Sequence, residues 1–451
     1  MFIVLPYPRG STFDWAWLLM SAYIYVLAAF WLFYYSRGMA ELTRALHAAR
    51  PVLYLLILWL LWHFVQLIPM PIELLAWFAP LSADIYQYTH PEIQAAPISV
   101  TTEATTEQLI KSIAYVVLFI LILLLVDTPQ RLRIMARWLV GLAVIQAVIA
   151  NLLYFADIDI FYESYSALGT FANRNQLAGY LQLNLAIGIG LLLADMREHG
   201  SSSWREWMRR SANTLLSRKV RLRIYLAIMV ITLVLTHSRM GNTAFFVSMT
   251  VTGILALLLM KHSPRPVVIL LTSLIIIDLF IVSKWFGLEQ LQQRFVQMQQ
   301  ETVSLDIKTN TLNRLDTTMH ANTLKDDAGW SGTGAGSFYA VFPAYQGRQQ
   351  PGYFQHAHND YMEFLTDTGY IGITLLGGIV LITIVTGLVA MRSRRYPLMR
   401  GMAFTSVMGI LSLMIHSATD FNLRIPANAT LFIVILAFAF ISHSMPVRQS
   451  K

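Results

Sequence analysis

Residues 109–126 read LIKSIAYVVLFILILLLV, an apolar run with one lysine near its start. A helix needs about 20 mostly apolar residues to cross the hydrocarbon core of a bilayer, so this stretch is expected to span a membrane. Comparable stretches recur along the chain, which predicts an all-α polytopic membrane protein with about 11–12 transmembrane helices. The expected spans are residues 15–35, 51–70, 109–126, 134–155, 177–195, 222–236, 242–260, 266–284, 369–391, 400–418 and 427–444.

The composition supports this class. Of the 451 residues, 56% are hydrophobic and 13% are charged, whereas soluble domains carry about 25% charged residues. The 11 Trp and 20 Tyr residues suit the two membrane–water interfaces. The chain has no cysteine, which excludes a disulfide framework, a thiol nucleophile and a thiolate metal site.

The charges of the loops predict the side that each loop faces. Every second loop is basic, as at 36–50 and 197–223, whereas the loop at 71–108 contains no Lys or Arg. Basic loops stay in the cytoplasm, so we interpret the net charge of +8 as this bias and not as a nucleic-acid site. The rule places the C-terminus inside and the N-terminus outside, and it places outside the loops at 71–108, 156–176, 237–241, 285–368 and 419–426.

The long outer loop divides the chain into three parts. We expect an N-terminal block of transmembrane helices at 1–284, a loop domain at 285–368 and C-terminal transmembrane helices at 369–451. Apolar residues recur at helical spacing through 288–325, which predicts amphipathic helices in the loop. Asp278 lies inside the expected eighth span. A carboxylate is costly against lipid, so we expect Asp278 to face the bundle, in a functional or a structural role.

Two arginines stand at the outer ends of expected spans. Arg174 lies between Asn173 and Asn175 ahead of the fifth span, and Arg239 ends the turn between the sixth and seventh spans. Each arginine could be an interfacial anchor whose cation reaches water. The flanking asparagines favour a polar site at Arg174, and the other cations of the chain are mainly cytoplasmic. Because guanidinium groups bind phosphate oxygens in a bidentate way, we predict an anion site that contains both arginines.

The densest polar cluster is His356-Ala-His-Asn-Asp-Tyr361. Histidine titrates near neutral pH, so His356 or His358 could act as a general acid or base. The same two histidines could chelate a metal, but suitable carboxylate partners are not obvious, and we expect no metal site. Asn359 and Asp360 are candidates for substrate binding, with capping of the next helix as the alternative.

A glycine-rich run, Gly332-Thr-Gly-Ala-Gly336, precedes this cluster. The run lacks both the strand and the Lys-Ser/Thr pair of a phosphate-binding loop, so a nucleotide site is not expected. We interpret it as a turn that lets the backbone approach a sugar or a partner.

Together these segments resemble the O-antigen ligase and O-antigen polymerase superfamily of bacterial inner-membrane glycosyltransferases. The resemblance covers roughly residues 165–430, and it rests on residues 169–179, Ser238-Arg239, 332–338 with 343–345, 356–361, Gly369-Tyr-Ile-Gly372, and 416–423 with 426–428. It implies a membrane fold of the broad GT-C type around a periplasmic cavity. It also implies that Arg174 and Arg239 bind the diphosphate of an undecaprenyl-diphosphate-linked glycan, that His356 or His358 is the catalytic base, and that no metal ion or other cofactor is needed.

The expected activity is therefore glycosyl transfer to an acceptor hydroxyl on the periplasmic face of the inner membrane. A ligase would use a lipid A-core acceptor in lipopolysaccharide synthesis, and a polymerase would join repeat units of an O-antigen or exopolysaccharide. The alternatives are a protein O-oligosaccharyltransferase and a polysaccharide flippase or other transporter, which would need ionisable groups along a path through the bilayer. The expected partners are the lipid-linked donor, the glycan acceptor and membrane lipid, without nucleic acid.

Overall fold

The computed structural model describes residues 1–158, 166–195, 218–260, 319–346 and 353–446. The expected eighth span with Asp278, most of the basic loop at 197–223 and residues 288–318 of the expected amphipathic region lie outside the described residues.

The described part of the chain is built from helices and one pair of very short strands. Eight of its helices are long and apolar enough to cross a membrane, which confirms the prediction of an all-α polytopic membrane protein. These helices are α1 (Asp14–Ser36), α6 (Thr102–Leu125), α7 (Pro129–Phe155), α8 (Arg174–Asp195), α11 (Arg239–Leu259), α16 (Asp360–Ser393), α17 (Pro397–Ser417) and α18 (Pro426–Ser444). Two more expected spans coincide with α3 (Arg50–Gln66) and α10 (Arg218–Leu235).

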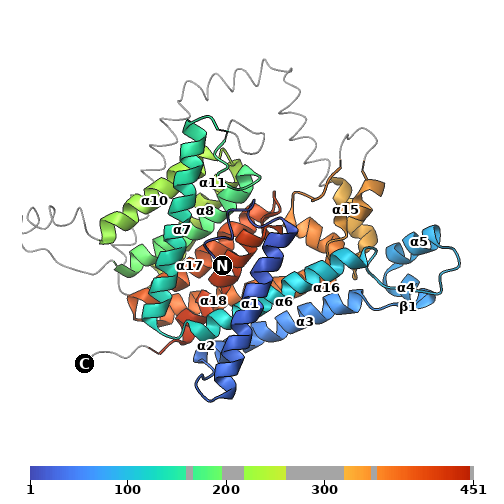
Figure 1. The fold of residues 1–451 in the computed structure, drawn as a ribbon, viewed down its shortest axis with the longest axis horizontal. Coiled ribbons are helices and arrows are strands. Elements are labelled where there is room, and N and C mark those ends of the chain that lie inside the picture. Colours follow the sequence, from blue (N-terminus) through green and yellow to red (C-terminus); the bar gives the residue numbers. More distant parts are fainter. Residues whose placement is uncertain (159–165, 196–217, 261–318, 347–352, 447–451) are drawn as a thin grey trace, which may run out of the picture.

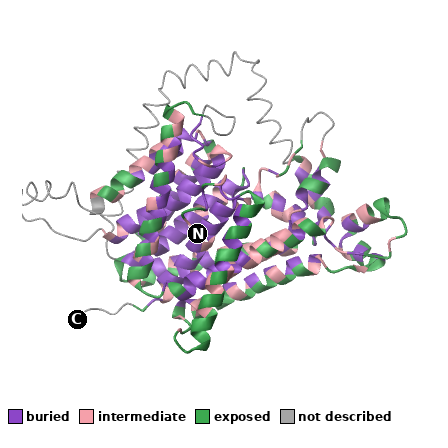
Figure 2. Ribbon diagram, in the orientation of Figure 1, coloured by how far each residue is buried: buried purple, intermediate pink, exposed green. Residues whose placement is uncertain are grey.

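Three helices form the centre of the bundle (Figures 1 and 2). In the apolar window of α8, 94% of the residues are buried, and the corresponding values are 78% for α17 and 83% for α18. The windows of α1 and α16 are only 28% and 22% buried, although their residues are equally apolar. Because an exposed apolar helix is stable in lipid but not in water, these outer helices form the surface that contacts the membrane.

Glycines allow α8 and α17 to approach each other closely. A Cβ added to Gly190 would lie 2.4 Å from the carbonyl oxygen of Gly401, and a Cβ added to Gly401 would lie 2.2 Å from the carbonyl oxygen of Gly190. The Thr405 hydroxyl donates to the carbonyl of Ala186 across the same contact, at 3.0 Å. Small residues commonly bring transmembrane helices together in this way, because van der Waals packing is the main attraction between helices in lipid.

The loop at 71–108 folds into a small helical unit that the sequence did not predict. It contains α4 (Ile72–Phe78), α5 (Pro80–Thr89) and the antiparallel strands β1 (Met70–Pro71) and β2 (Ala95–Ala96). Leu81 and Ile85 pack against an apolar cluster of the late outer loop that includes Phe338. The late loop contributes a helical stretch at 319–328, α15 (Phe338–Val341) and the 3-10 turn η1 (Phe342–Ala344). The two outer loops therefore fold together at one end of the bundle (Figure 1).

The helix that contains the expected ninth span begins before the apolar run at 369–391. The helix α16 starts at Asp360, and its backbone leaves the helical region once, at Gly369, where φ is 66°. A Cβ at this position would lie 2.1 Å from the carbonyl oxygen of Trp330. The segment 360–368 thus belongs to the outer region, and the lipid-facing helix follows the break.

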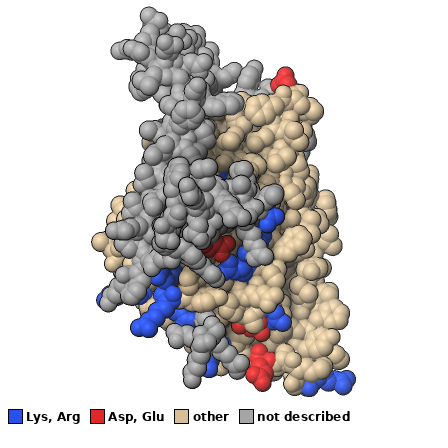
Figure 3. Space-filling model, turned by 90° about the vertical axis from the view of Figure 1, so that its left-hand side faces the viewer, with Lys and Arg blue, Asp and Glu red and all other residues tan. Residues whose placement is uncertain are grey.

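The charged side chains are also unevenly distributed over the surface. On the face shown in Figure 3, most of the described Lys and Arg side chains lie in the lower half, and much of the remaining described surface carries no charge. A surface without charge suits contact with lipid tails.

Replacement of Gly401 by alanine is expected to destabilise the bundle by about 1–3 kcal/mol, because the added methyl group overpacks the contact with α8. Thermal unfolding of the detergent-solubilised protein would measure the loss. Gly141→Ala on α7 is the matched control, since its Cβ meets no atom within 4 Å. Equal unfolding temperatures for the two variants would show that the close contact between α8 and α17 does not support the fold.

Candidate functional site

The two predicted histidines both pack against one aromatic ring. The rings of His356 and Phe421 are stacked with centroids 4.2 Å apart, and the ring of His358 meets Phe421 edge-on at 5.2 Å. Phe421 belongs to the turn between α17 and α18. The backbone of His358 adopts a positive φ of 50°, which is uncommon for a residue with a side chain and fixes the sharp bend of the cluster.

A buried carboxylate orients His356. The Nδ1 atom of His356 lies 2.9 Å from Oε1 of Glu363, and the backbone N–H of Ala357 donates to Oε2 of Glu363 at 3.1 Å. The side chain of Glu363 is 3% exposed and that of His356 is 31% exposed. With Nδ1 held by Glu363, Nε2 is the ring nitrogen left for a substrate.

The same contact favours the protonated imidazole. Burial lowers the pKa of His356, but the negative charge and the hydrogen bond of Glu363 more than offset this effect, so the pKa lies above its usual value of 6.5. A carboxylate that stabilises an imidazolium makes histidine a stronger proton acceptor.

Arg424 completes this arrangement, and the sequence analysis missed it. Its Nε atom lies 3.0 Å from Oε1 of Glu363, its Nη2 pairs with Asp367, and its guanidinium lies 4.5 Å from the centroid of the Phe364 ring. Its side chain is 8% exposed. Burial lowers the pKa of Arg424, but Glu363 and Asp367 together raise it above the usual value. Arg424 lies in the 3-10 turn η2 (Asn422–Arg424), far along the chain from Glu363 and Asp367, so the sequence alone does not show the buried ion pairs.

The glycine-rich run binds a carboxylate of its own chain. The backbone N–H groups of Gly336 and Phe338 donate to the two oxygens of Asp367, at 2.8 and 2.9 Å. The N–H of Gly334 donates to the Asp367 carbonyl at 2.9 Å, and Gly332 lies so close that a Cβ would be 2.4 Å from the same carbonyl oxygen. In the structure, this run therefore binds both the backbone of residues 366–369 and the carboxylate of Asp367, which pairs with Arg424.

Asn359 and Asp360 make structural contacts. The side chain of Asn359 caps α16 by accepting from the N–H groups of Tyr361 and Met362. The buried carboxylate of Asp360 accepts from the Ser417 hydroxyl at 2.6 Å and from the N–H of Leu423 at 3.1 Å. The contacts of Asn359 fit the capping alternative. The contacts of Asp360 connect α16 to the turn that carries Phe421.

The two asparagines beside Arg174 connect this helix end to the same turn. The side chain of Asn173 accepts from the N–H of Asn175 at 2.8 Å, and the amide of Asn175 donates to the carboxylate of Asp420. The carbonyl of Asp420 in turn accepts from the N–H of Asp360 at 3.2 Å. A continuous chain of hydrogen bonds thus joins residues 173–175 to the segment that holds the histidine cluster.

Arg174 and Arg239 each stand at the first position of a long helix. Arg174 is half-buried at the start of α8, and Arg239 is exposed at the start of α11, after its cap Ser238. Within the described residues, no hydrogen bond or ion pair engages either guanidinium. The first turn of α11 packs on α8 and α17, because a Cβ on Gly241 would meet Ala178 at 2.7 Å and His416 at 3.3 Å. The structure thus places Arg239 beside the helices that carry the site, but shows no contact between Arg239 and His356 or His358.

Removal of the Arg424 side chain is expected to destabilise the fold by about 3–5 kcal/mol, because Glu363 and Asp367 would remain buried without their cation. Chemical or thermal unfolding in detergent would measure this loss. The control is Arg37→Ala, since Arg37 is exposed at the end of α1. If both variants unfolded like the wild type, the buried ion pairs would not contribute to stability.

A comparison with protein families gives one match. The family model described as O-antigen ligase matches residues 224–377. The matched region contains Arg239, His356, His358, Glu363 and Asp367, and it ends before Arg424. A search of curated proteins finds no match. The match of residues 224–377 to this model supports the assignment of this multi-pass membrane protein to the O-antigen ligase and polymerase superfamily.

Proposed function

We propose that the protein transfers a glycan from undecaprenyl diphosphate to an acceptor hydroxyl, as an O-antigen ligase or a polysaccharide polymerase. The observation that carries this proposal is the pairing of His356 with the buried Glu363 inside a domain of the O-antigen ligase family. The reaction would take place at the periplasmic face of the bacterial inner membrane. The lack of Lys and Arg in the loop at 71–108 supports this side, because that loop folds against the late loop that precedes His356.

His356 is the proposed general base. Its Nδ1–H donates to Glu363, and Nε2 accepts the proton of the acceptor hydroxyl as the oxygen attacks the anomeric carbon. The new glycosidic bond forms while the bond between the anomeric carbon and the diphosphate oxygen breaks. The lipid diphosphate leaves with the bonding electrons, and the imidazolium later releases its proton to solvent through the exposed side of the ring.

Arg174 and Arg239 are the proposed ligands of the diphosphate. Each stands in the first turn of a helix of more than 20 residues, where the positive end of the helix dipole disfavours a cation and favours an anion. A bound diphosphate would relieve this repulsion and accept hydrogen bonds from both guanidinium groups. The same charges would stabilise the leaving group as its negative charge develops.

The net negative charge around His356 supports its proposed role as the general base. Glu363 and Asp367 together carry more negative charge than the single guanidinium of Arg424 can neutralise. The excess negative charge favours the imidazolium that forms when the base accepts a proton. The buried contacts hold Glu363 in place, so no rearrangement is needed during the transfer.

A protein O-oligosaccharyltransferase would use the same base and the same donor, and differs only in its acceptor. A transporter would instead need ionisable groups along a path through the bundle. In the described residues, Glu363, Asp367 and Arg424 gather beside His356, which favours a transferase.

An activity assay with purified protein would test the proposal. Labelled undecaprenyl-diphosphate oligosaccharide and candidate acceptors should give a glycosidic product and free lipid diphosphate, and the working acceptor would identify the subtype. Arg174→Ala and Arg239→Ala should each lower the rate roughly 100-fold or more, because each removes a charge that stabilises the leaving group. Arg37→Ala should keep the wild-type rate. Full activity in the Arg174 and Arg239 variants would refute the proposed mechanism.

The pH dependence of the rate would test the role of His356. The rate should rise with pH as His356 loses its proton, with a midpoint above 6.5, because Glu363 raises the pKa of the imidazole. Glu363→Gln should move this midpoint to lower pH, since burial then acts without the opposing carboxylate, and should also lower the maximal rate.

His356→Gln should lower the rate by about 10²–10⁴-fold, more than His358→Gln does. The reverse order would assign the base to His358.

A further inference from the structure

The short helix α4 carries an apolar patch that the described part of the chain leaves exposed. Its buried side is formed by Ile72 and Leu75, whereas Leu74 and Trp77 are 51% and 80% exposed. The ring of Trp77 stacks on that of Phe78, with centroids 6.3 Å apart. Residues three and four apart are neighbours on a helix, so Leu74, Trp77 and Phe78 form one continuous patch.

The exposed sides of α4 and α5 differ in polarity. From Asp84 onward, each exposed side chain of α5 carries a polar group, namely Asp84, Gln87, Tyr88 and Thr89. On α4, helical spacing places Leu74 and Phe78 on one side of Trp77 and Glu73 on the other. An indole ring between apolar and charged side chains matches the boundary between lipid tails and water.

The buried side of α4 is attached to helices that face lipid. Ile72 and Leu75 belong to an apolar cluster with Trp62 of α3, and Ile371 and Leu375 of α16 pack against this cluster. The last two residues lie just after the break at Gly369, where the lipid-facing part of α16 begins. The helix α4 is therefore held near the level at which α16 enters the membrane, and Figure 1 shows it at the edge of the bundle, beyond the end of α3.

The exposed face of α3 leads to the same patch. From Tyr54 onward, the exposed residues of α3 recur at helical spacing and none is charged: Tyr54, Ile57, Leu58, Leu61 and Phe64. Such a face is stable against lipid tails but not against water. Ile68, which is 43% exposed, follows the end of α3 and precedes α4. The apolar patch of α4 thus continues the lipid-facing surface of α3.

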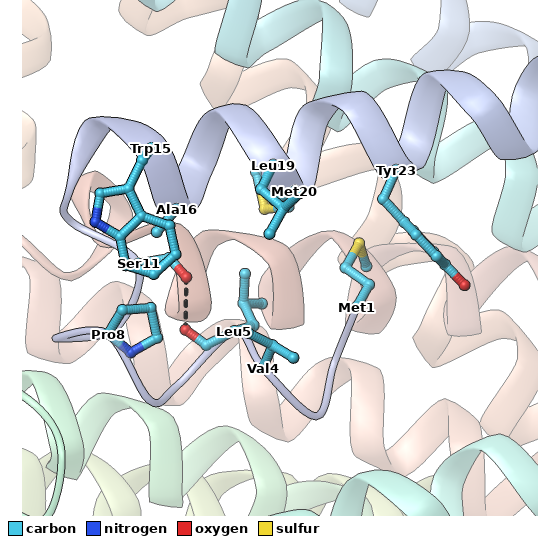
Figure 4. Close-up of a pocket in the computed structure, with 10 residues that line it drawn as sticks. All are labelled: Met1, Val4, Leu5, Pro8, Ser11, Trp15, Ala16, Leu19, Met20 and Tyr23. Carbon is cyan, nitrogen blue, oxygen red and sulfur yellow. Dashed lines mark hydrogen bonds between the residues drawn. The ribbon is translucent and has the colours of Figure 1, made fainter.

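Exposed aromatic residues mark the membrane boundary at this end of the bundle. Trp330 is 71% exposed, and its ring lies 5.5 Å from that of Tyr370, the first residue after the break in α16. Trp15 in the first turn of α1 is 58% exposed and borders a small apolar pocket (Figure 4). Trp and Tyr are enriched where lipid tails meet the headgroups, so these residues place the boundary at the starts of α1 and of the lipid-facing part of α16.

We propose that α4 is an interfacial helix that lies on the membrane surface, with Leu74 and Trp77 inserted among the lipid headgroups. The partner is the bilayer itself. The contact is apolar, because the loop at 71–108 contains no Lys or Arg that would attract anionic lipids. Leu81 and Ile85 of the same unit pack against the late loop that precedes the histidine cluster, so the bilayer also supports that loop. This inference does not depend on the proposed glycosyl transfer.

Site-directed spin labelling tests the position of α4, because the chain has no cysteine and a single introduced cysteine takes up the label alone. The full-length protein with Leu74→Cys or Trp77→Cys is placed in nanodiscs of phosphatidylethanolamine and phosphatidylglycerol. The accessibility of the nitroxide to oxygen, which concentrates in lipid, and to a water-soluble nickel chelate gives the depth of the label. Both labels should lie about 5–10 Å into the boundary between headgroups and acyl chains.

Two controls bracket this depth. A label at Gln87→Cys, which is exposed on α5, should lie in water, and a label at Leu61→Cys, which is 51% exposed on α3, should lie among lipid tails. All four side chains are exposed, so the labelled variants should unfold close to the temperature of the wild type.

Two results would overturn the proposal. Labels at positions 74 and 77 that meet the nickel chelate as freely as the label at position 87 would place α4 in water. Low accessibility to both reagents would show that protein covers the patch, either a second copy, which broadens the spectrum by dipolar coupling, or another segment of the same chain. The proposed transfer reaction would stand after either result, since the activity assay tests it separately.

Discussion

The arrangement of the candidate site depends on one buried cation. Arg424 lies between the carboxylates of Glu363 and Asp367, and these three groups belong to two segments that are far apart in the chain. Removing charges from water is costly, and the cost is recovered only when each charged group has its partners in place. The guanidinium therefore determines where α16 can begin relative to the turn before α18.

Both carboxylates also bind other parts of the site, so the position of Arg424 affects those parts as well. Glu363 also holds Nδ1 of His356, and Asp367 also accepts from the backbone of the glycine-rich run. That run is in turn held by Gln66 at the end of α3, which donates to the carbonyls of Ser331 and Asp367 and accepts from the N–H of Ala335. A helix from the first part of the chain thereby supports the proposed base, although it contributes no residue to it.

The transmembrane architecture could be predicted from the sequence because apolar length is a local property. Residues 109–126 showed a span without any knowledge of its neighbours, and α6 contains nearly all of that run. The break at Gly369 could not be predicted in this way, because it is required by the carbonyl of Trp330 in another segment. The fold of the 71–108 loop was missed for a similar reason, since its helices are stabilised by apolar contacts to residues such as Phe338 in the late loop.

The residues of the candidate site also differ in whether a local signal in the sequence reveals them. His356, Arg174 and Arg239 were predicted as site residues because a polar or cationic residue on the expected outer side is unusual in such a chain. Arg424 has the same local signal, but its partner Asp367 is 57 residues away, and only the fold shows that the pair is buried. Asn359 was predicted to bind substrate, with helix capping as the alternative, and Asn173 was predicted to belong to a polar site beside Arg174; in the structure both side chains accept from backbone N–H groups at a helix start.

The charges that favour proton transfer to His356, the proposed base, also limit the fraction of His356 that is unprotonated. Excess negative charge around the ring favours the imidazolium, so a larger fraction of the protein carries a proton on His356 before the acceptor arrives. A base is most effective when its pKa lies near the working pH, where proton affinity and the population of the free form are balanced. Arg424 provides that balance: it opposes the effect of Glu363 on the pKa of His356 while it holds the same carboxylate in position. One arginine therefore both fixes the geometry of the proposed base and lowers its pKa.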